Sequence, residues 1–280
     1  MNPGYSPVSA TVLFPTYGLA TFAFWALKSV VDQTVRDIEI FVICDGSPPG
    51  MVSMFNGMAQ QDKRIRVFEF PKSERTGEPY RDLLIKNEAK GTSIYYCSHD
   101  DLWLPDHIYE LEKTLKKKDF AHSLNAAVSL PGNETVNGNI FQFVHYADLS
   151  DIRYRNRMLN EDVLQNFFGL TFAAHSRKSY LQLNQGWTTT PPGIWTDLYM
   201  WRKFLVQPGH SFGTCKKITA LNFPASLRKH MTMQERSNEL ELLFNKMQDI
   251  TFIRQIRKRT GKRYPDMVEI IKSCLSKLIT

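Results

Sequence analysis

Two adjacent carboxylates, Asp100 and Asp101, lie in the stretch Tyr95 to Asp106, which reads YYCSHDDLWLPD. They follow a short apolar segment and precede a Pro-Asp pair. Carboxylate oxygens are the ligands that hard cations such as Mg²⁺ and Mn²⁺ prefer, and open α/β sheets bind ligands at the carboxyl ends of their strands. The stretch therefore predicts a cation that holds a ligand there. The alternative is a helix N-cap, in which a carboxylate only accepts hydrogen bonds from the first N–H groups of the next helix.

Glycine-rich phosphate loops are absent from the sequence. It contains neither a GxGxxG turn nor a GxxxxGK[ST] loop, so the phosphates of a bound nucleotide need another positive group. A divalent cation on Asp100 would neutralise a diphosphate and take up charge as it departs. A nicotinamide oxidoreductase is disfavoured, because the segment Pro15 to Ala20 supplies only one glycine.

Short β-rich segments alternate with amphipathic segments in the first 120 residues, which predicts an α/β fold with a mainly parallel sheet and helices on both faces. The predicted strands are Thr11 to Phe14, Glu39 to Cys44, Ile65 to Phe70 and Ser93 to Cys97. The predicted helices are Ala20 to Asp32, Tyr80 to Lys90 and Asp106 to Lys117. Asp45 to Pro49 is a turn signal.

The pattern is looser after residue 120. Strands are predicted at Asn125 to Leu130 and Ile140 to Tyr146, helices at Asn160 to Phe168 and Thr196 to Leu205, and a loop at Gly186 to Gly193. From Met233 onward the pattern is helical, with a basic break at Arg257 to Arg263 and a final helix at Pro265 to Leu278. We divide the chain into residues 1–125, which would bind the nucleotide, 126–232, which would bind the acceptor, and a basic helical extension at 233–280.

Composition is that of a folded protein, since 280 residues with 42% hydrophobic content can bury a full core. The four cysteines form no CxxC pair, which fits a reducing cytoplasm and argues against a disulfide scaffold or a zinc site. The apolar run from Ala20 to Leu27 is too short to span a bilayer, and the N-terminus has no charged leader. We therefore expect a cytoplasmic protein.

Four motifs carry a family resemblance: Pro15-Thr16-Tyr17, SVVDQT at the end of the first predicted helix, Cys44-Asp45-Gly46-Ser47, and SHDDLWLPDH. In this order and spacing they resemble the inverting family 2 glycosyltransferases of the GT-A fold. The resemblance covers about 120 N-terminal residues. It implies that the chain transfers a monosaccharide from a nucleotide diphosphate sugar, taken as UDP-linked, to a hydroxyl of a glycan or lipid-linked acceptor in surface glycan or polysaccharide synthesis.

The resemblance assigns roles to several residues of the N-terminal half. Thr16 and Tyr17 would line the nucleotide pocket, and Asp45 would contact the base or the ribose. Arg81 would face the base or the phosphates, with Lys86 as its rival. Asp100 would bind Mn²⁺ or Mg²⁺, and His99 occupies the variable position of that metal loop beside the nucleotide. Asp101 is expected to fix the loop.

The second half carries the predicted catalytic group. The segment WTDLYMW is similar to a family helix start, which makes Asp197 the general base that removes the acceptor's proton; a helix cap is the alternative. The segment SLRKH resembles the family's RxH element, which places Arg228 near the diphosphate and makes His230 a metal ligand. Either Trp187 or Trp195 is predicted to face the acceptor. Trp201 is predicted to be buried.

Three departures from the family pattern reduce the number of carboxylates: Ser98 or His99 replaces the first aspartate of the metal loop, Cys44 the aspartate after the second strand, and Thr196 the glutamate before the base. We therefore expect the cation to bind mainly together with the nucleotide. The same losses allow a degenerate protein that binds the donor without turning it over.

The net charge of +7 is concentrated late in the chain, in Arg254, Arg257, Lys258, Arg259, Lys262 and Arg263. This extension would contact the inner face of an anionic membrane, or it is a solvated tail or a dimer contact. Nucleic acid is not the expected partner, because that class does not explain the carboxylate motif. The oligomeric state has no signal in the sequence.

Overall fold

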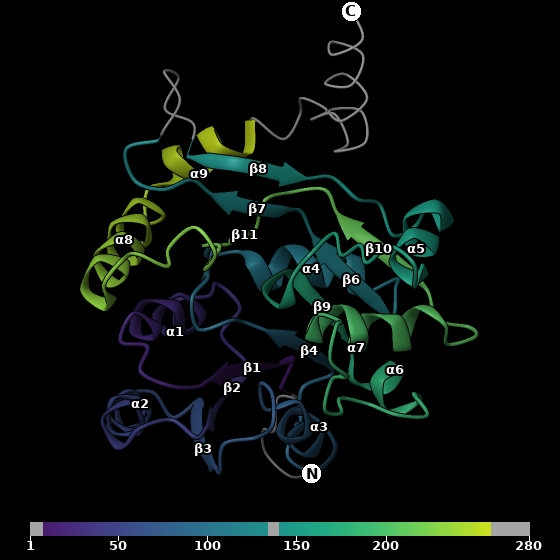
Figure 1. Ribbon diagram of the computed structural model, residues 1–280, viewed down its shortest axis with the longest axis horizontal. Coiled ribbons are helices and arrows are strands. Elements are labelled where there is room, and N and C mark those ends of the chain that lie inside the picture. The colour runs from purple at the N-terminus through teal and green to yellow at the C-terminus, as the bar shows by residue number, and fades with distance from the viewer. Residues whose placement is uncertain (1–7, 134–139, 259–280) are drawn as a thin grey trace, which may run out of the picture.

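Seven strands form the main sheet: β1 (Ala10–Thr16), β2 (Ile38–Asp45), β3 (Ile65–Phe70), β4 (Ser93–Tyr96), β6 (Phe120–Ser123), β9 (Ala173–Ser176) and β10 (Phe212–Cys215). Their order across the sheet is β10-β6-β9-β4-β1-β2-β3 (Figure 1). The computed structural model describes residues 8–133 and 140–258. Two antiparallel ribbons accompany the sheet, β5 (Leu102–Trp103) with β11 (Ala220–Leu221), and β7 (Asn125–Val128) with β8 (Phe141–His145).

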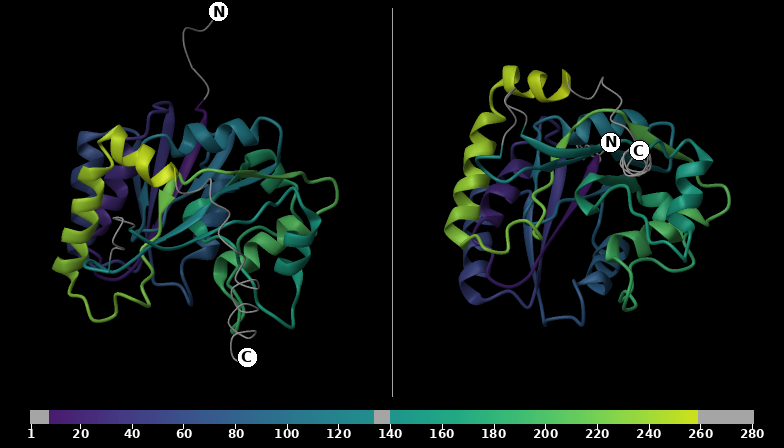
Figure 2. Two further views of the ribbon diagram at one scale, coloured as in Figure 1. Left: turned by 90° about the horizontal axis from the view of Figure 1, so that it is seen from above. Right: turned by 45° about the horizontal axis from the view of Figure 1, so that its top comes forward.

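The helices of the described chain lie around this sheet (Figures 1 and 2). They are α1 (Ala23–Val31), α2 (Pro49–Gln61), α3 (Glu78–Asn87), α4 (His107–Leu115), α5 (Ile152–Leu159), the 3₁₀ turn η1 (Leu170–Phe172), α6 (Arg177–Leu181), α7 (Thr196–Leu205), α8 (Met233–Lys246) and α9 (Ile250–Lys258). The resulting α/β architecture agrees with the predicted fold class.

The centre of the sheet is parallel and fully covered. Every residue of β1 and β2 is buried, as expected for parallel strands that carry helices on both faces. β4, β1, β2 and β3 are parallel to one another, whereas β9 runs antiparallel to both β4 and β6. Thr16 is opposite Cys44, and Leu13 is opposite Tyr96, so β1, β2 and β4 end at the same edge of the sheet.

The turn after β2 requires a glycine. Gly46 has a φ of +64°, and a Cβ atom there would lie 2.5 Å from the Cβ of Lys72. Its N–H donates to the carbonyl of Phe70 at 2.9 Å, which ties the turn to the end of β3. The Asp-Gly pair of the third predicted motif therefore holds Asp45 at the carboxyl edge of the sheet.

Most elements predicted from periodicity are confirmed. The first four predicted strands correspond to β1 to β4, the two later strands to the ribbon β7–β8, and the helix predicted at Thr196 to Leu205 has those bounds as α7. The loop predicted at Gly186 to Gly193 contains no helix or strand.

The helix predicted at Asn160 to Phe168 is wrong. The helix of this region is α5, which begins after Asp151, whose side chain accepts a hydrogen bond from the Arg153 N–H at 2.9 Å. Asn160 ends α5, because its side-chain oxygen accepts from the N–H groups of Asp162 and Val163 and starts a turn.

The helix α2 was missed, because Pro48 and Pro49 were interpreted only as a turn signal. Pro49 is the first residue of α2. Proline is favoured at this position, because the N–H that it lacks would have no partner within the helix. Met51, Val52 and Phe55 are the buried residues of this helix.

The C-terminal part of the described chain packs back on the first helix. α8 lies beside α1 (Figures 1 and 2), and the rings of Trp25 and Phe244 are 5.5 Å apart. α9 is joined to the start of α4 by Arg257, whose two terminal nitrogens lie 2.8 and 2.7 Å from the carboxylate of Asp106. The predicted helix Pro265 to Leu278 and the basic residues Arg259, Lys262 and Arg263 lie outside the described residues, and the membrane contact stays a prediction.

Within residues 8–133 and 140–258, none of the helices has the length and apolar character needed to span a bilayer. The main sheet includes β9 and β10, which come from the predicted acceptor half. The division at residues 125 and 232 stays a prediction.

Candidate functional site

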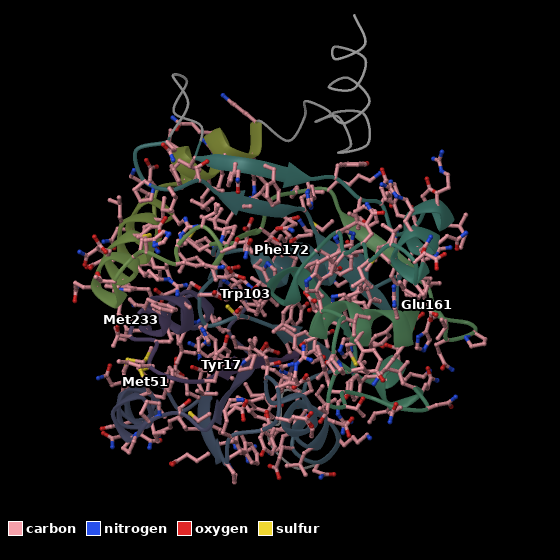
Figure 3. The ribbon with its side chains drawn as sticks, viewed as in Figure 1. Tyr17, Met51, Trp103, Glu161, Phe172 and Met233 are labelled. Carbon is pink, nitrogen blue, oxygen red and sulfur yellow. The ribbon has the colours of Figure 1, made fainter. Side chains whose placement is uncertain are left out.

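A pocket of about 190 Å³ lies at the carboxyl ends of β1 and β4, and we call it the strand-end pocket. Figure 3 labels Tyr17, which stands on its wall, near the middle of the molecule. The pocket is lined by Pro15, Tyr17, Thr76, Arg81, Ser98, His99, Asp100, Leu170, Thr196 and Asp197. Five residues predicted from the sequence thus come together from four separate parts of the chain: Tyr17, Arg81, His99, Asp100 and Asp197.

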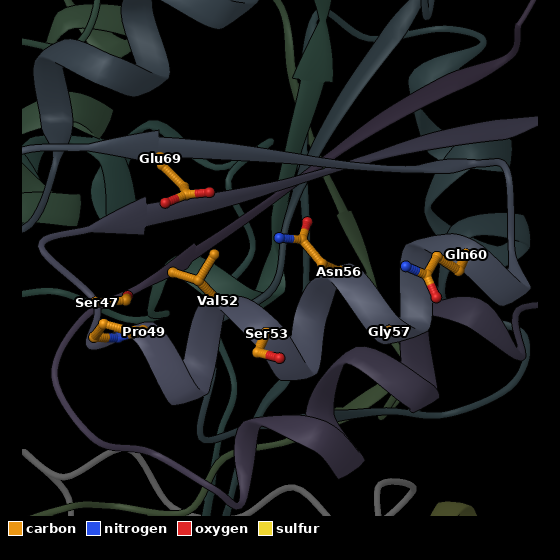
Figure 4. A pocket seen from close by; sticks show the side chains of 8 residues that line it. All are labelled: Ser47, Pro49, Val52, Ser53, Asn56, Gly57, Gln60 and Glu69. Carbon is orange, nitrogen blue, oxygen red and sulfur yellow. The ribbon is translucent and has the colours of Figure 1, made fainter.

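A larger hollow of about 470 Å³ lies between α2 and β3. Figure 4 shows Val52 and Asn56 of α2 on the side of the helix that faces Glu69 of β3. None of the residues predicted to do chemistry lines this hollow, so the strand-end pocket is the candidate site.

Asp100 and Asp101 have different surroundings. Asp101 is 4% exposed and accepts hydrogen bonds from the Thr171 hydroxyl at 2.5 Å, the Asn222 amide at 3.0 Å and the Phe223 N–H at 3.0 Å. Burial, and then the nearby charge of Asp100, raises the pKa of Asp101 to about 7. Asp101 therefore fixes the loop, as expected, and Asp100 is left to face the pocket.

His99 lies in an aromatic setting beside Asp100. Its ring centroid is 5.0 Å from that of Tyr17 and 5.8 Å from that of Phe22, and the residue is 8% exposed. Burial is the main cause that lowers the pKa of His99, so its imidazole is neutral at pH 7. The site therefore has Tyr17 and a neutral His99 as adjacent rings at its rim.

Arg81 supplies a buried positive charge to the pocket. The residue is 2% exposed, its guanidinium lies 4.7 Å from the Trp187 ring, and one terminal nitrogen donates to the Thr76 carbonyl at 2.5 Å. Its Nε and Nη1 atoms have no hydrogen-bond partner in the described part of the chain. Burial lowers the pKa of Arg81, but a guanidinium remains charged at neutral pH. Its donors are available for an anionic ligand.

Asp197 is at the start of α7 and reaches the pocket from the predicted acceptor half. Its Oδ1 accepts a hydrogen bond from the Leu198 N–H at 2.9 Å. Burial raises the pKa of Asp197 to about 6, while Arg81 and the hydrogen bonds counteract part of this rise. A carboxylate with a pKa near the working pH is suited to accept a proton.

Thr16 and Asp45 lie behind the pocket wall. Thr16 is fully buried, and Asp45 is 1% exposed. The carboxylate of Asp45 accepts from the Lys72 ammonium at 2.7 Å and from the Ser73 N–H at 2.5 Å. Neither residue lines the pocket, and their contacts with a nucleotide stay predictions.

The tryptophans separate clearly by exposure. Trp187 is 2% exposed, its ring lies 4.7 Å from the Arg81 guanidinium, and its indole N–H donates to the Tyr96 hydroxyl at 3.0 Å, so it offers no ring face at the surface. Trp195 is 53% exposed next to Thr196 of the pocket wall and can offer a ring face. Trp201 is 1% exposed, as predicted.

Arg228 does not line the strand-end pocket, and its predicted contact with the diphosphate stays a prediction. Arg228 is 2% exposed, and its guanidinium pairs with the Glu239 carboxylate at 2.7 and 2.5 Å, so it joins α8 to the segment before it. His230 is exposed at the surface, and its role as a metal ligand stays a prediction. Within the described ranges, no cluster of three or more His, Cys, Asp or Glu residues comes together.

Sequence reasoning missed two polar neighbours of Asp100. The Ser98 hydroxyl donates to Asp100 Oδ1 at 2.6 Å, and Arg236 Nη2 of α8 lies 3.6 Å from Asp100 Oδ2. Ser98 was considered only as a replaced carboxylate. Arg236 carries no signal in the sequence, because it is one of many polar residues of an amphipathic helix.

These residues fit a divalent cation only in part. Asp101 has both oxygens occupied, so Asp100 is the one carboxylate of the metal loop that faces the pocket. Mg²⁺ in nucleotide sites often has one or two protein carboxylates and takes its other ligands from phosphates and water. Asp100 therefore fits a cation that arrives with a diphosphate, and does not fit a cation held by the protein alone.

Comparison with known proteins agrees with this geometry. The model of the family described as "Glycosyl transferase family 2" matches residues 11–182. An uncharacterized glycosyltransferase of Rickettsia conorii is 34% identical over 113 residues, which cover 40% of this chain and 18% of that protein. The succinoglycan biosynthesis protein ExoW of Rhizobium meliloti is 31% identical over 96 residues, which cover 34% of this chain and 30% of that protein. The chain thus spans less than a third of these relatives.

Solved structures share the fold. Staphylococcus aureus TarS 1-349 in complex with UDP-GlcNAc has a TM-score of 0.59 and 14% identity, over 85% of this chain and 66% of that one. The mannosyltransferase PcManGT of Pyrobaculum calidifontis in complex with GDP-Man and Mn²⁺ has a TM-score of 0.54 and 17% identity, over 79% of this chain and 58% of that one. The fold is the GT-A fold of such glycosyltransferases. Because the family model also covers more than half of the residues, the chain belongs to glycosyl transferase family 2.

Proposed function

We propose that this chain transfers a monosaccharide from a nucleotide diphosphate sugar, taken as UDP-linked, to a hydroxyl acceptor with inversion at the anomeric carbon. The observation that carries the proposal is the meeting of Asp100, Arg81 and Asp197 in one pocket. Two of these groups suit a diphosphate and its cation, and the third suits an acceptor proton.

The reaction needs one proton acceptor and one stabilised leaving group. The acceptor oxygen attacks the anomeric carbon while the bond from this carbon to the diphosphate oxygen breaks, and the diphosphate keeps the electron pair. Asp197 accepts the hydroxyl proton as the new bond forms. No acid is required for departure, in contrast to a glycosidase with two carboxyl groups. A single displacement of this kind inverts the anomeric configuration.

Charge on the diphosphate would be held from two sides of the pocket. Arg81 has two unpartnered nitrogen donors, as described above, and Asp100 would hold Mn²⁺ or Mg²⁺ together with the phosphate oxygens. When bound, such a cation neutralises the negative charge that builds up on the leaving group.

The metal is expected to bind with the nucleotide and only weakly without it, because a single carboxylate of the metal loop faces the pocket. Titration calorimetry should therefore show Mn²⁺ binding in the presence of UDP and no micromolar binding in its absence. Micromolar affinity for Mn²⁺ alone would contradict this ligand set.

Trp195 is the proposed acceptor contact. Its indole is more than half exposed and lies next to the pocket residue Thr196. An exposed indole can stack on the apolar face of a sugar ring. A Trp195→Ala variant should raise the acceptor KM and leave the UDP affinity unchanged.

The comparisons support a UDP-linked donor and a glycan product. A similar structure contains UDP-GlcNAc, and a similar protein is named for succinoglycan biosynthesis. We extend the proposal to surface glycan or polysaccharide synthesis in the cytoplasm, with a glycan or lipid-linked acceptor at the inner face of the membrane. Flotation of the full chain with anionic liposomes, against a chain that ends at Gln248, tests the membrane contact.

A thermal-shift screen with UDP-, GDP-, CMP- and dTDP-sugars, with and without Mn²⁺, tests the donor class. A ligand that binds only the folded state raises the melting temperature. UDP-sugars with Mn²⁺ should give the largest rise, and the best of them should release UDP on incubation. A flat screen would reject the proposal.

A non-catalytic donor-binding protein is the second candidate. The absence of a three-ligand metal cluster in the described chain favours it. It predicts the same thermal shift but no UDP release and no sugar transfer with any acceptor, so turnover separates the two.

A further inference from the structure

The positive charge of Arg236 in α8 lies near the carboxylate of Asp100, but two of its nitrogen donors have no hydrogen-bond partner in the described part of the chain. Its side chain is 13% exposed, and the guanidinium carbon lies 3.9 Å from the centroid of the Phe22 ring. Nη2 is 3.6 Å from Oδ2 of Asp100, which is too long for a hydrogen bond. Nε and Nη2 are buried, and neither has a hydrogen-bond partner among residues 8–133 and 140–258.

Buried donors without a partner are costly, so such groups in folded proteins are usually satisfied. A planar guanidinium presents its N–H groups in a fork that matches the oxygens of a phosphate. Nη2 of Arg236 lies 3.6 Å from Oδ2 of Asp100, which is part of the wall of the strand-end pocket, although Arg236 itself is not among the residues that line it. The chemistry of these donors, and their place beside a wall residue of the pocket, suit an anionic ligand.

The position of Arg236 is set by contacts along α8. Thr232 and Glu235 form a capping box at the start of the helix, with the Thr232 N–H donating to Glu235 at 2.7 Å. One turn after Arg236, Glu239 is held by the buried Arg228. These contacts fix α8 on both sides of Arg236, and the contact of its guanidinium with the Phe22 ring holds the side chain beside Asp100.

We propose that Arg236 binds the diphosphate of the donor, with its free N–H groups donating to phosphate oxygens while Asp100 stays beside it. The inference rests on the proposed function. A fixed protein cation would then supply part of the charge that the reduced metal loop cannot hold through a divalent ion. As a consequence, the chain should bind the diphosphate measurably in the absence of metal.

Calorimetry in EDTA with UDP and with uridine tests this proposal, because only UDP carries the phosphates. Wild-type chain should bind UDP more tightly than uridine. Arg236→Gln should weaken UDP binding roughly tenfold to hundredfold and leave uridine binding unchanged. Arg236→Lys keeps the positive charge but loses the planar guanidinium, so its UDP affinity should lie between those of wild type and Arg236→Gln.

Lys246→Gln is the matched control, because it removes one positive charge from an exposed position of the same helix. It should bind UDP like wild type. Melting temperatures of all variants show whether the fold is intact. If Arg236→Gln binds UDP like wild type, or loses UDP and uridine equally, the proposal is overturned. If wild type binds no UDP even with Mn²⁺, the proposed function itself fails.

Discussion

Asp197 differs from an exposed aspartate because burial raises its pKa to about 6. The carboxylate is then a stronger base than usual and is still ionised at pH 7. Arg81 lies in the same pocket and lowers that pKa in part, which keeps the charged form populated. Burial thus makes Asp197 a stronger base, while Arg81 keeps its carboxylate ionised.

Replacing Asp197 with Asn should lower kcat roughly 10²–10⁴-fold, because the amide cannot accept the acceptor proton. UDP affinity should stay close to wild type, because the substitution leaves the phosphate-binding side chains in place. Rates of UDP release and UDP binding by calorimetry measure the two effects separately. Loss of binding without loss of kcat would assign Asp197 to donor recognition instead.

The pH profile should carry the same signature. Below pH 6 protonated Asp197 cannot act as a base, so kcat/KM should fall about tenfold per pH unit and level off above pH 7. Burial lowers the pKa of His99, so this imidazole should titrate at lower pH than an exposed histidine. A profile that is flat from pH 5 to pH 8, with UDP affinity constant, would be inconsistent with this role.

At the scale of elements, Asp101 joins three parts of the chain. Its carboxylate accepts hydrogen bonds from Thr171 in η1 and from Asn222 and Phe223 after β11. These bonds hold the loop that presents Asp100 to the strand-end pocket. The loop reaches the pocket because Asp101 ties it to η1 and to the segment after β11.

Asp101→Ala should destabilise the protein by about 2–4 kcal/mol, because it leaves buried donors without a partner. Urea unfolding at pH 7 measures the change. Asp162→Ala, at an exposed position of the loop after α5, is the control and should stay within about 0.5 kcal/mol of wild type. Equal stability of the two variants would show that the loop is held by other contacts.

The elements that sequence predicts well are those with strong periodicity. β1 and β2 are almost wholly apolar, and α7 alternates polar and apolar residues at helical spacing, so their types and positions were predictable. The helix of this region was predicted too late in the chain, because the segment IRYRNRML of α5 buries only Met158 and so has little apolar periodicity. The side chains of Asp151 and Asn160 mark its two ends. Pairing of β9 and β10 with the first half depends on long-range contacts that no local pattern encodes.

The same division applies to the site. Motifs predicted the residues that follow strands, such as Tyr17 and Asp100, because strand ends meet at one edge of the sheet. The pairing of Arg228 could not be predicted, because a motif gives a residue type and not the partner that its charge will find in the fold. In this chain that partner is Glu239, two turns into the next helix.

At the scale of the whole molecule, the C-terminal helix α8 lies beside the strand-end pocket. α8 packs on α1 and brings Arg236 to Asp100, while Arg228 and Glu239 tie α8 to the preceding segment and to the carbonyl of Ser129 at 3.1 Å. The proposed donor site would therefore draw on both ends of the described chain.

Glu239→Ala should destabilise the protein by about 3–5 kcal/mol, because it leaves the guanidinium of Arg228 buried without its counter-charge. Glu241→Ala, two residues further along the same helix, should change the free energy of unfolding by less than about 1 kcal/mol. Denaturant unfolding of both variants measures the difference. If the two variants unfold alike, the buried pair does not hold α8 in place.

The arrangement of the strand-end pocket is the central claim, and a crystal structure with Mn²⁺ and the UDP-sugar that gives the largest thermal shift tests it most directly. We predict the diphosphate between Asp100 and Arg81, with the anomeric carbon facing the side of the pocket that holds Asp197. A nucleotide bound elsewhere, or an anomeric carbon turned away from Asp197, would contradict the account.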